Sequence, residues 1–347
     1  MWGAYAATFA VGFALSLVLS PVCARVGERL GIVDWPGGRR QHSRPTSRLG
    51  GVALYVAFVA AVALSQALPV PRLDPNEPRR VLALLAGTSI VFLVGLLDDV
   101  LDLPAWAQFL GQLLAAAVGV WGLIFIEYVN NPFSEDPQAR IYFPRWFAVG
   151  LSLFWLLGVT TTVNWLDGLD GLAAGVVAIA SLVLFANAAF RLQPPQASVA
   201  LLPLALSGAC LGFLPHNFHP ARVFMGGGAY TIGYALGALS IIGGAKVATV
   251  LLVIGVPALD VAYLILRRMR RGGRPHVGGR DHLHFRLLDR GWPQRRIVLG
   301  YYAFCAFFGA LALALPPRQY KLLALLALGA LALALLLRAE RLPRRQA

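Results

Sequence analysis

Two groups of acidic side chains lie at the ends of segments that are otherwise apolar enough to cross a bilayer. The first group is Asp98, Asp99 and Asp102, and the second is Asn164, Asp167 and Asp170. A carboxylate in or near hydrocarbon is costly, so it persists where a cation or water compensates it. Carboxylate and amide oxygens are the hard ligands that Mg²⁺ and a phosphorylated substrate require. The alternative is acids that extend from helix ends into water, but two such groups among only 16 acidic residues favour a site.

The spacing within each group predicts which side chains act together. Asp98 and Asp102 are four residues apart and share one face of a helix, whereas Asp99 points about 100° away from Asp98. Asn164 and Asp167 are three residues apart and also share a face. Each group therefore presents two oxygen-bearing side chains in one direction.

The composition predicts a membrane protein. The chain has 347 residues, of which 58% are hydrophobic and 13% charged, whereas a soluble domain carries about twice that charged fraction. Long apolar runs between short polar loops predict an all-α, polytopic integral membrane protein with about eleven transmembrane helices. The expected spans are 2–22, 49–67, 81–97, 104–126, 146–164, 170–190, 197–215, 228–243, 247–267, 297–315 and 320–338. No remaining stretch is long or polar enough for a second domain, so residues 1–347 are predicted to form a single transmembrane domain.

Arginines set the expected orientation, because basic residues concentrate in cytoplasmic loops. Ten arginines lie between Arg267 and Arg296, and others follow the first and last spans. This pattern places the N-terminus outside, the C-terminus in the cytoplasm, and both acidic groups on the cytoplasmic face of the cell membrane. The loops expected to form the site are 23–48, 98–103, 164–171, 215–228 and 268–296. The net charge of +14 is expected to serve mainly for attraction to anionic lipid headgroups, and no nucleic-acid partner is predicted.

Two further polar segments favour binding of phosphate. Three glycines in FMGGGAY precede the start of an expected helix, where free N–H groups attract anions. The segment RDHLHFR, residues 280–286, places two histidines between two arginines, a set suited to a diphosphate through charge-assisted hydrogen bonds. Two histidines without thiolate or carboxylate partners at suitable spacing are too few for zinc.

Together these segments resemble the polyprenyl-phosphate N-acetylhexosamine-1-phosphate transferases, a family of glycosyltransferases. The resemblance rests on RRQHSRPTSRLGG (39–51), LLDDVLDL (96–103), NWLDGLDGL (164–172), PHNFHPARVFMG (215–226) and RDHLHFRLLDRG (280–291). It implies transfer of a sugar 1-phosphate from a UDP-sugar to polyprenyl phosphate, with release of UMP and use of Mg²⁺ or Mn²⁺. It also implies a role at the start of a cell-envelope glycan, such as lipopolysaccharide or teichoic acid. The loop between the ninth and tenth spans is most similar to the branch that uses UDP-N-acetylglucosamine and undecaprenyl phosphate.

The resemblance also assigns roles to individual residues. Asp98, Asp99 and Asp167 are the implied catalytic residues, with Asp98 placed to act as a base on the lipid phosphate. Asp167 and Asn164 are the implied metal ligands. The implied substrate contacts are Asp170, Phe224, Arg280, His282, His284, His42, Arg44 and Arg48. Asp170 is expected at the nucleotide, and Phe224 is expected to stack on uracil.

The sequence departs from the family pattern at the glycine loop. The family has an aspartate after Phe-Met-Gly that helps to hold Mg²⁺, but here Gly227 follows, and Gly233 arrives one position early. Either the aspartate has been substituted or one residue has been lost. Asp260 is the only other acid that the topology allows to replace it. In the histidine segment, Gly279 stands where an aspartate is frequent, and Phe285 replaces a histidine.

Several alternatives remain open from the sequence. The pentapeptide branch of the family also has Phe at the position of Phe285, so phospho-N-acetylmuramoyl-pentapeptide transfer is the second enzyme interpretation. The missing aspartate permits a catalytically impaired homologue. Acids within membrane helices also occur in ion-coupled transporters, but those usually show inverted repeats, which this chain lacks. The sequence leaves open a homodimer, the sugar and the prenyl length.

Overall fold

The computed structural model describes residues 1–36, 45–131, 133–134, 136, 139–192, 194–244, 247–270, 272, 281–315 and 318–341. Its helices are α1 (Trp2–Leu30), α2 (Gly50–Ala67), α3 (Glu77–Leu101), α4 (Ala105–Trp121), α5 (Arg145–Leu166), α6 (Leu172–Ala186), α7 (Ala197–Asn217), α8 (Gly228–Ile242), α9 (Val247–Arg270), α10 (Leu283–Leu288), α11 (Gln294–Ala314) and α12 (Arg318–Arg341). A π-helical turn, Asn187–Arg191, follows α6. Two antiparallel hairpins pair β1 (Val33–Asp34) with β2 (Thr46–Ser47), and β3 (Tyr128–Asn130) with β4 (Arg140–Tyr142).

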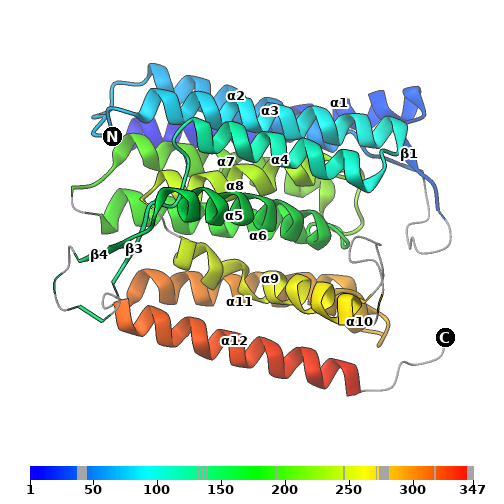
Figure 1. The fold of residues 1–347 in the computed structure, drawn as a ribbon. Coiled ribbons are helices and arrows are strands. Elements are labelled where there is room, and N and C mark those ends of the chain that lie inside the picture. The colour runs from blue at the N-terminus through cyan, green and yellow to red at the C-terminus, as the bar shows by residue number, and fades with distance from the viewer. Residues whose placement is uncertain are drawn as a thin grey trace.

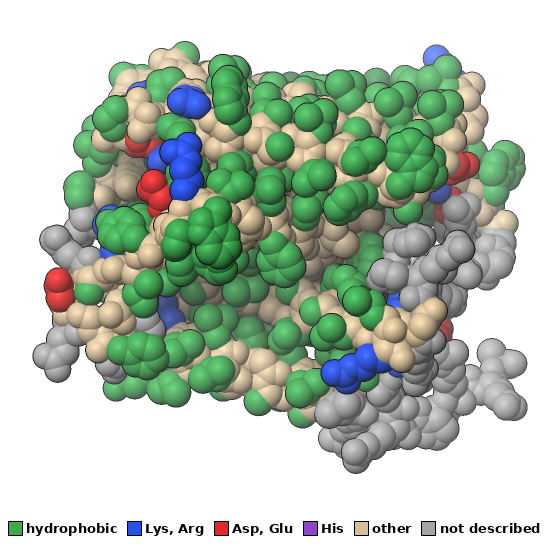
Figure 2. Space-filling model, viewed as in Figure 1, with side chains coloured by type: hydrophobic (Ala, Val, Ile, Leu, Met, Phe, Trp, Pro, Cys, Tyr) green, Lys and Arg blue, Asp and Glu red, His purple; other side chains and the backbone are tan. Residues whose placement is uncertain are grey.

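The helices form a bundle whose long axes run in one general direction (Figure 1). Eight of the described helices are at least 18 residues long and apolar enough to cross a membrane, and three shorter apolar helices lie in α4, α8 and α12. Apolar side chains cover the middle of the visible face, while the coloured charged side chains lie towards its two ends (Figure 2). This distribution suits a bilayer, because hydrocarbon cannot solvate charge. The protein is an all-α polytopic membrane protein, as predicted.

Each of the eleven predicted spans coincides with a helix, although several helices continue beyond their apolar part. Thus α1 extends to Leu30, α3 to Leu101 and α9 to Arg270, because hydropathy marks only the apolar portion of a helix, whereas backbone hydrogen bonds continue past it. The short helix α10 and both hairpins were not predicted. The first residues of α1 and the last turns of α12 lie at opposite ends of the bundle (Figure 1), as an odd number of crossings requires. Assignment of one end to the cytoplasm stays a prediction.

Helix α8 lies at the centre of the bundle and determines where the site forms. Every residue from Gly228 to Ile242 is buried, so this short helix is surrounded by protein. Its first turn crosses two helices through paired glycines. A Cβ atom on Gly95 of α3 would lie 2.5 Å from the carbonyl oxygen of Gly227, and one on Gly51 of α2 would lie 2.6 Å from the Cα of Gly228. Small residues allow this close backbone approach, which brings the glycine loop against the C-terminal half of α3.

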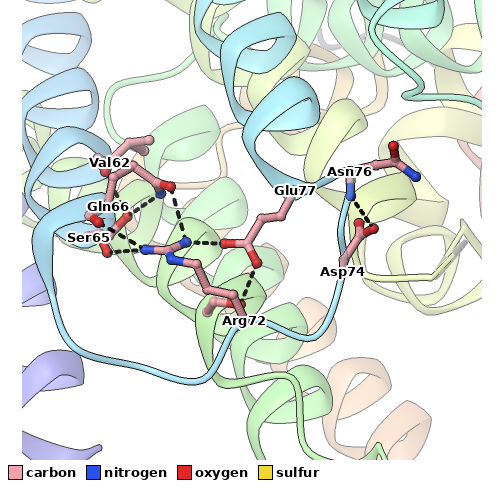
Figure 3. Close-up of polar contacts among 8 residues, drawn as sticks. Val62, Ser65, Gln66, Arg72, Asp74, Asn76 and Glu77 are labelled. Atoms are coloured by element: carbon pink, nitrogen blue, oxygen red, sulfur yellow. Dashed lines mark hydrogen bonds and ion pairs between the residues drawn. The ribbon is translucent and has the colours of Figure 1, made fainter.

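A separate polar cluster lies at the other end of α3 (Figure 3). Glu77, only 1% exposed, accepts hydrogen bonds from the Arg72 guanidinium and from Ser198 Oγ, the latter at 2.6 Å. Arg72 also donates to the carbonyl oxygen of Ser65 at 2.9 Å and to Gln66 Oε1 at 3.1 Å. The cluster joins the loop after α2, the start of α3 and the start of α7, so it fixes three elements with one neutralised carboxylate.

Candidate active site

The C-terminal turns of α3 direct two adjacent carboxylates to different partners. Asp98 Oδ1 accepts a hydrogen bond from Gln108 Nε2 at 2.8 Å, and Asp99 Oδ2 accepts one from the Gly227 backbone N–H at 2.8 Å. The glycine loop can come this close to Asp99 because Gly226 has a φ of +55° and no side chain. A Cβ atom there would lie 2.4 Å from Asp99 Oδ2. Asp102 adopts the left-handed conformation that ends α3, and its side chain is exposed.

The second acidic group begins where α5 ends. Asp167 follows the last residue of α5, and its backbone N–H bonds to the carbonyl oxygens of Val163 and Asn164. Burial of its carboxyl, together with the negative charges of Asp170 and Asp99, raises the pKa of Asp167 to about 7. Among the described residues, no ion pair reaches either Asp99 or Asp167. The two acidic groups therefore meet in space and their charges repel each other, while Arg48 and the Gly227 N–H offset only part of the charge of Asp99.

Asp170 is held by the loop that follows α7. Its Oδ2 interacts with His219 Nδ1 at 2.8 Å and accepts the Ala221 backbone N–H at 3.1 Å. The next residue, Gly171, donates its N–H to Asn217 Oδ1 at 3.0 Å and starts α6 with a φ of +80°. These contacts fix the segment 164–172 against the segment 215–224. His219 was not among the predicted site residues.

The β1–β2 hairpin supports the same loop from the N-terminal side. The Phe224 backbone N–H donates to the Ser47 carbonyl oxygen at 2.8 Å, and the Gly50 N–H donates to the Phe224 carbonyl oxygen at 3.0 Å. Arg48 forms ion pairs with Asp34 at 3.5 Å and with the exposed Asp102 at 3.7 Å. Phe224 itself is half-buried.

A small pocket opens beside Asp99. Its polar lining includes the side chains of Arg48 and Asp99, and its apolar lining includes Leu49, Val52, Phe92 and Leu96. One cationic group, one carboxylate and four apolar side chains thus meet at the junction of α2, α3 and the start of α8. The cavity itself has room for little more than one water molecule, so these groups describe the chemistry of this surface and do not form a preformed phosphate pocket.

The histidine segment approaches from the other side, but its two histidines have different environments. His282 Nδ1 interacts with Asp260 Oδ2 at 2.8 Å, and the Leu283 N–H contacts both oxygens of the same carboxylate at 3.2 Å. Asp260 is buried in α9 and committed to these contacts. The structure places the Asp260 carboxylate on the histidine segment, and its role as a replacement for the missing metal ligand stays a prediction.

His284 is buried and faces the second acidic segment. Its Nε2 has no hydrogen-bond partner among the described residues, and a Cβ atom on Gly168 would lie 2.6 Å from it. Burial, and then the charge of the neighbouring His282, lower the pKa of His284 well below its usual range. His284 is thus neutral near pH 7, so the charge assistance expected from a cationic histidine does not apply to this side chain.

The carboxylates permit one kind of cation site and disfavour another. The described residues contain no group of three or more His, Cys, Asp or Glu side chains arranged to hold a metal, so an all-protein cage does not fit. Mg²⁺, however, is commonly held by one or two carboxylates together with water and substrate phosphates. Asp99 and Asp167 repel each other, and no ion pair reaches either carboxylate within the described part of the chain. This pair fits a cation that is shared with a bound diphosphate.

The structure brings most of the predicted site residues to one end of the bundle. Those placed there are Arg48, Asp98, Asp99, Asn164, Asp167, Asp170, Phe224, His282 and His284. His42, Arg44 and Arg280 lie outside the described residues. The sequence interpretation missed Gln108 and Tyr230, which contact members of both acidic groups. Their polarity within apolar helices was the available signal, since such groups need partners in a membrane.

Comparison with known proteins identifies the class of this acid-rich membrane bundle. Residues 81–244 match glycosyl transferase family 4. A probable undecaprenyl-phosphate N-acetylglucosaminyl 1-phosphate transferase of Bacillus subtilis is 31% identical over 88% of this chain and 84% of its own length. A decaprenyl-phosphate N-acetylglucosaminephosphotransferase of Mycolicibacterium smegmatis is 33% identical over 81% of this chain and 75% of its own. A phospho-N-acetylmuramoyl-pentapeptide-transferase of Desulforudis audaxviator is 33% identical over 88% and 96%, respectively. The chain belongs to glycosyl transferase family 4.

Proposed function

We propose that this protein transfers N-acetylglucosamine 1-phosphate from its UDP-sugar to a polyprenyl phosphate, such as undecaprenyl phosphate, and releases UMP. The observation that carries the proposal is the meeting of Asp99 and Asp167 at one end of a membrane bundle, where their charges repel each other and no ion pair from the described residues reaches either carboxylate. Two relatives whose names state this transfer cover more than four-fifths of the chain. The proposed location is the cytoplasmic membrane with the site on the cytoplasmic face, where the product would begin a cell-envelope glycan.

The reaction joins two phosphates, and the protein supplies mainly position and charge. An oxygen of the lipid phosphate forms a new bond to the sugar-bearing phosphorus of the UDP-sugar. The bond from that phosphorus to the bridging oxygen breaks, and this oxygen leaves with UMP. Mg²⁺, when bound, would neutralise charge on the diphosphate, with Asp99 and Asp167 as its protein ligands and the Asn164 amide oxygen beside them.

The remaining residues divide between the two substrates. Asp98 is placed to accept a proton from the lipid phosphate, because the N–H from Gln108 stabilises its charged form. The surface around Asp99 offers Arg48 to the phosphate and apolar side chains to the first part of the prenyl chain. His284 presents an unpartnered nitrogen towards Gly168, where a neutral imidazole suits a hydrogen bond to the diphosphate.

A second candidate is transfer of phospho-N-acetylmuramoyl-pentapeptide. A relative with that name aligns with 88% of this chain and 96% of its own length. The two candidates share the acidic groups and differ in the donor sugar. Membership of a glycosyltransferase family favours either enzyme over the ion-coupled transporter considered from the sequence.

The test uses the full-length protein purified in detergent with polyprenyl phosphate and Mg²⁺. UDP-N-acetylglucosamine, other UDP-N-acetylhexosamines and UDP-N-acetylmuramoyl-pentapeptide are supplied separately, and mass spectrometry detects the polyprenyl-diphospho-sugar while UMP release is followed. We expect product with UDP-N-acetylglucosamine and none when Mg²⁺ is removed by a chelator. Product only with the pentapeptide substrate would establish the second candidate. No product with any donor, from a protein that remains folded, would indicate the impaired homologue.

A further inference from the structure

Four side chains from four helices form a continuous series of hydrogen bonds across the site. Tyr230 Oη of α8 donates to Gln108 Oε1 of α4 at 2.7 Å, and Gln108 Nε2 donates to Asp98 Oδ1 of α3 at 2.8 Å. Asn164 of α5 hydrogen-bonds to Tyr230 through its side chain. We call this series, Asn164–Tyr230–Gln108–Asp98, the polar relay. It connects one residue of each acidic group through Gln108, which the proposed function uses only as a donor to Asp98, and through Tyr230, which the proposed function has not used.

The polar relay has a single consistent direction. Gln108 Nε2 also donates to the Leu103 carbonyl oxygen at 2.9 Å, so both its acceptors require N–H groups and its Oε1 must face Tyr230. Because the Tyr230 hydroxyl donates its proton to Gln108, its oxygen is left to accept an N–H from the Asn164 amide. This arrangement directs the Asn164 carbonyl oxygen away from Tyr230, and every donor in the relay points towards Asp98.

Such a series is more than a set of independent contacts. Hydrogen bonds that share one direction polarise one another, and the effect is larger where water is scarce. Tyr230 is only 5% exposed, so its hydroxyl is held by protein. The relay therefore fixes the Asp98 carboxylate and the Asn164 amide relative to each other, with Asp98 held as an acceptor.

We propose that Gln108 and Tyr230 are positioning residues that align Asp98 with the lipid phosphate and Asn164 with the cation-bound diphosphate. This inference rests on the proposed transfer. It assigns to the glycine loop a second contribution besides the Gly227 N–H on Asp99: the loop supplies no carboxylate, but the helix that it starts supplies the phenol that joins the two acidic groups.

The same helix offers a matched control. Tyr234 lies one turn after Tyr230, is 1% exposed, and donates its hydroxyl to the Ala115 carbonyl oxygen of α4 at 3.1 Å. Its hydroxyl contacts backbone, and neither Asp98 nor Asn164. Tyr230→Phe and Tyr234→Phe therefore remove the same atom from the same buried helix, and only the first change interrupts the polar relay.

The experiment measures kcat and the KM of both substrates for each variant, alongside its melting temperature in detergent. We expect Tyr230→Phe to lower kcat about tenfold or more, with little change in either KM, because alignment of the reacting groups is lost while binding surfaces remain. We expect Tyr234→Phe to keep the wild-type kcat. Equal kcat in the two variants would overturn the inference, as would a loss of kcat in Tyr230→Phe that is matched by an equal loss of folded protein.

Gln108 provides the second, independent arm. Gln108→Glu keeps an acceptor for Tyr230 but places a carboxylate against Asp98, so we expect kcat to fall at least as far as in Gln108→Leu. The double variant Gln108→Leu, Tyr230→Phe should have a kcat only slightly lower than that of either single variant, because residues of one series act as a unit. Wild-type kcat in Gln108→Glu, or multiplying losses in the double variant, would refute the relay. If wild-type protein makes no polyprenyl-diphospho-sugar, the proposed function fails instead, and that result is distinct from either outcome above.

Discussion

The two ends of α3 carry carboxylates in opposite electrostatic conditions: Glu77 is buried, and Asp99 is half-buried. At the first residue of the helix, Glu77 is paired with Arg72 and hydrogen-bonded to Ser198. Near the last residue, Asp99 receives one backbone N–H from Gly227 and lies close enough to Asp167 for their charges to repel. Both ends are made by the same apolar helix, so the difference lies in the partners that the rest of the chain provides.

The carboxylate of Glu77 stabilises the fold, whereas the carboxylates of Asp99 and Asp167 lower its stability. Burial removes water from the Glu77 carboxylate, but the Arg72 guanidinium and the Ser198 hydroxyl replace the lost hydrogen bonds. The same contacts join three elements. Acids that repel each other and are only partly compensated lower stability, so they imply a ligand that is cationic or that brings a cation. Substitution should therefore have opposite consequences at the two ends.

The largest expected effect is on turnover at the acidic end. Asp98→Asn and Asp167→Asn should each reduce transfer by about 10²-fold or more, because each removes a charge that acts on the reacting phosphates. Both proteins should remain folded, as judged by size-exclusion profile and melting temperature. Turnover close to wild type in either variant would show that its assigned role is wrong.

The glycine loop is the next most sensitive place. Gly227→Asp should prevent normal folding, because a Cβ atom on Gly227 would lie 2.3 Å from the backbone of Gly95. Insertion of an aspartate between Gly226 and Gly227 restores the family spacing, and we expect it to raise activity or to lower the Mg²⁺ concentration required. Yield, melting temperature and Mg²⁺ titration of turnover distinguish the two variants. If neither change alters metal dependence, this loop does not lie at the cation.

At the paired end, the expected effect is on stability. Glu77→Gln should lower the free energy of unfolding by about 1–3 kcal/mol, since it leaves the Arg72 guanidinium without its carboxylate. Turnover per folded molecule should be unchanged, because the cluster lies at the opposite end of α3 from the acids. The measurements are thermal unfolding and specific activity in the same detergent. Lost turnover in a fully folded Glu77→Gln protein would erase the contrast between the two ends.

The smallest expected effect is a gain in stability. The pKa of Asp167 is raised to about 7, so the stability linked to its protonation is present below its unfolded pKa, near 4, and is lost as pH rises through about 7. Without divalent cations, Asp167→Asn should therefore melt about 2–4 °C above wild type at pH 8 and by a clearly smaller margin at pH 5, where only part of this stability has been lost. An increase of the same size at both pH values would show that the charge of Asp167 is not the cause.

Much of the fold follows from local pattern, whereas the partners of polar residues do not. Apolar runs located the eleven apolar helices among those described, but not the short helix α10, and the acidic motifs located the end of the bundle where they meet. The contact of Glu77 with Ser198 joins residues far apart in the chain, and no periodicity encodes it. The same holds for Asp260 and His282, because a carboxylate in α9 is equally compatible with a cation site until its partner is known.

The helical spacing gave only part of the acidic site. It placed Asp98 and Asp102 on one face, but the last turn of α3 ends in a left-handed residue at Asp102, which exposes that side chain. Asp99, expected to point elsewhere, is the acid that meets Asp167 and the glycine loop. Residue spacing predicts the direction in which a side chain leaves a helix. The residue at which the helix ends, and the loop that packs against that end, depend on tertiary contacts.

The crowding around the glycine loop also restricts how the chain can change over generations. At each of Gly226, Gly227 and Gly228, an added Cβ atom would approach another atom to 2.4 Å or less: the Arg48 carbonyl oxygen, the Gly95 backbone or the Gly51 Cα. Single-codon exchanges in this stretch are therefore unfavourable, whichever residue they introduce. Replacement of any one of these glycines by aspartate meets the same clashes, whereas an insertion would lengthen the loop. The loop therefore tolerates few single-residue substitutions at these three positions.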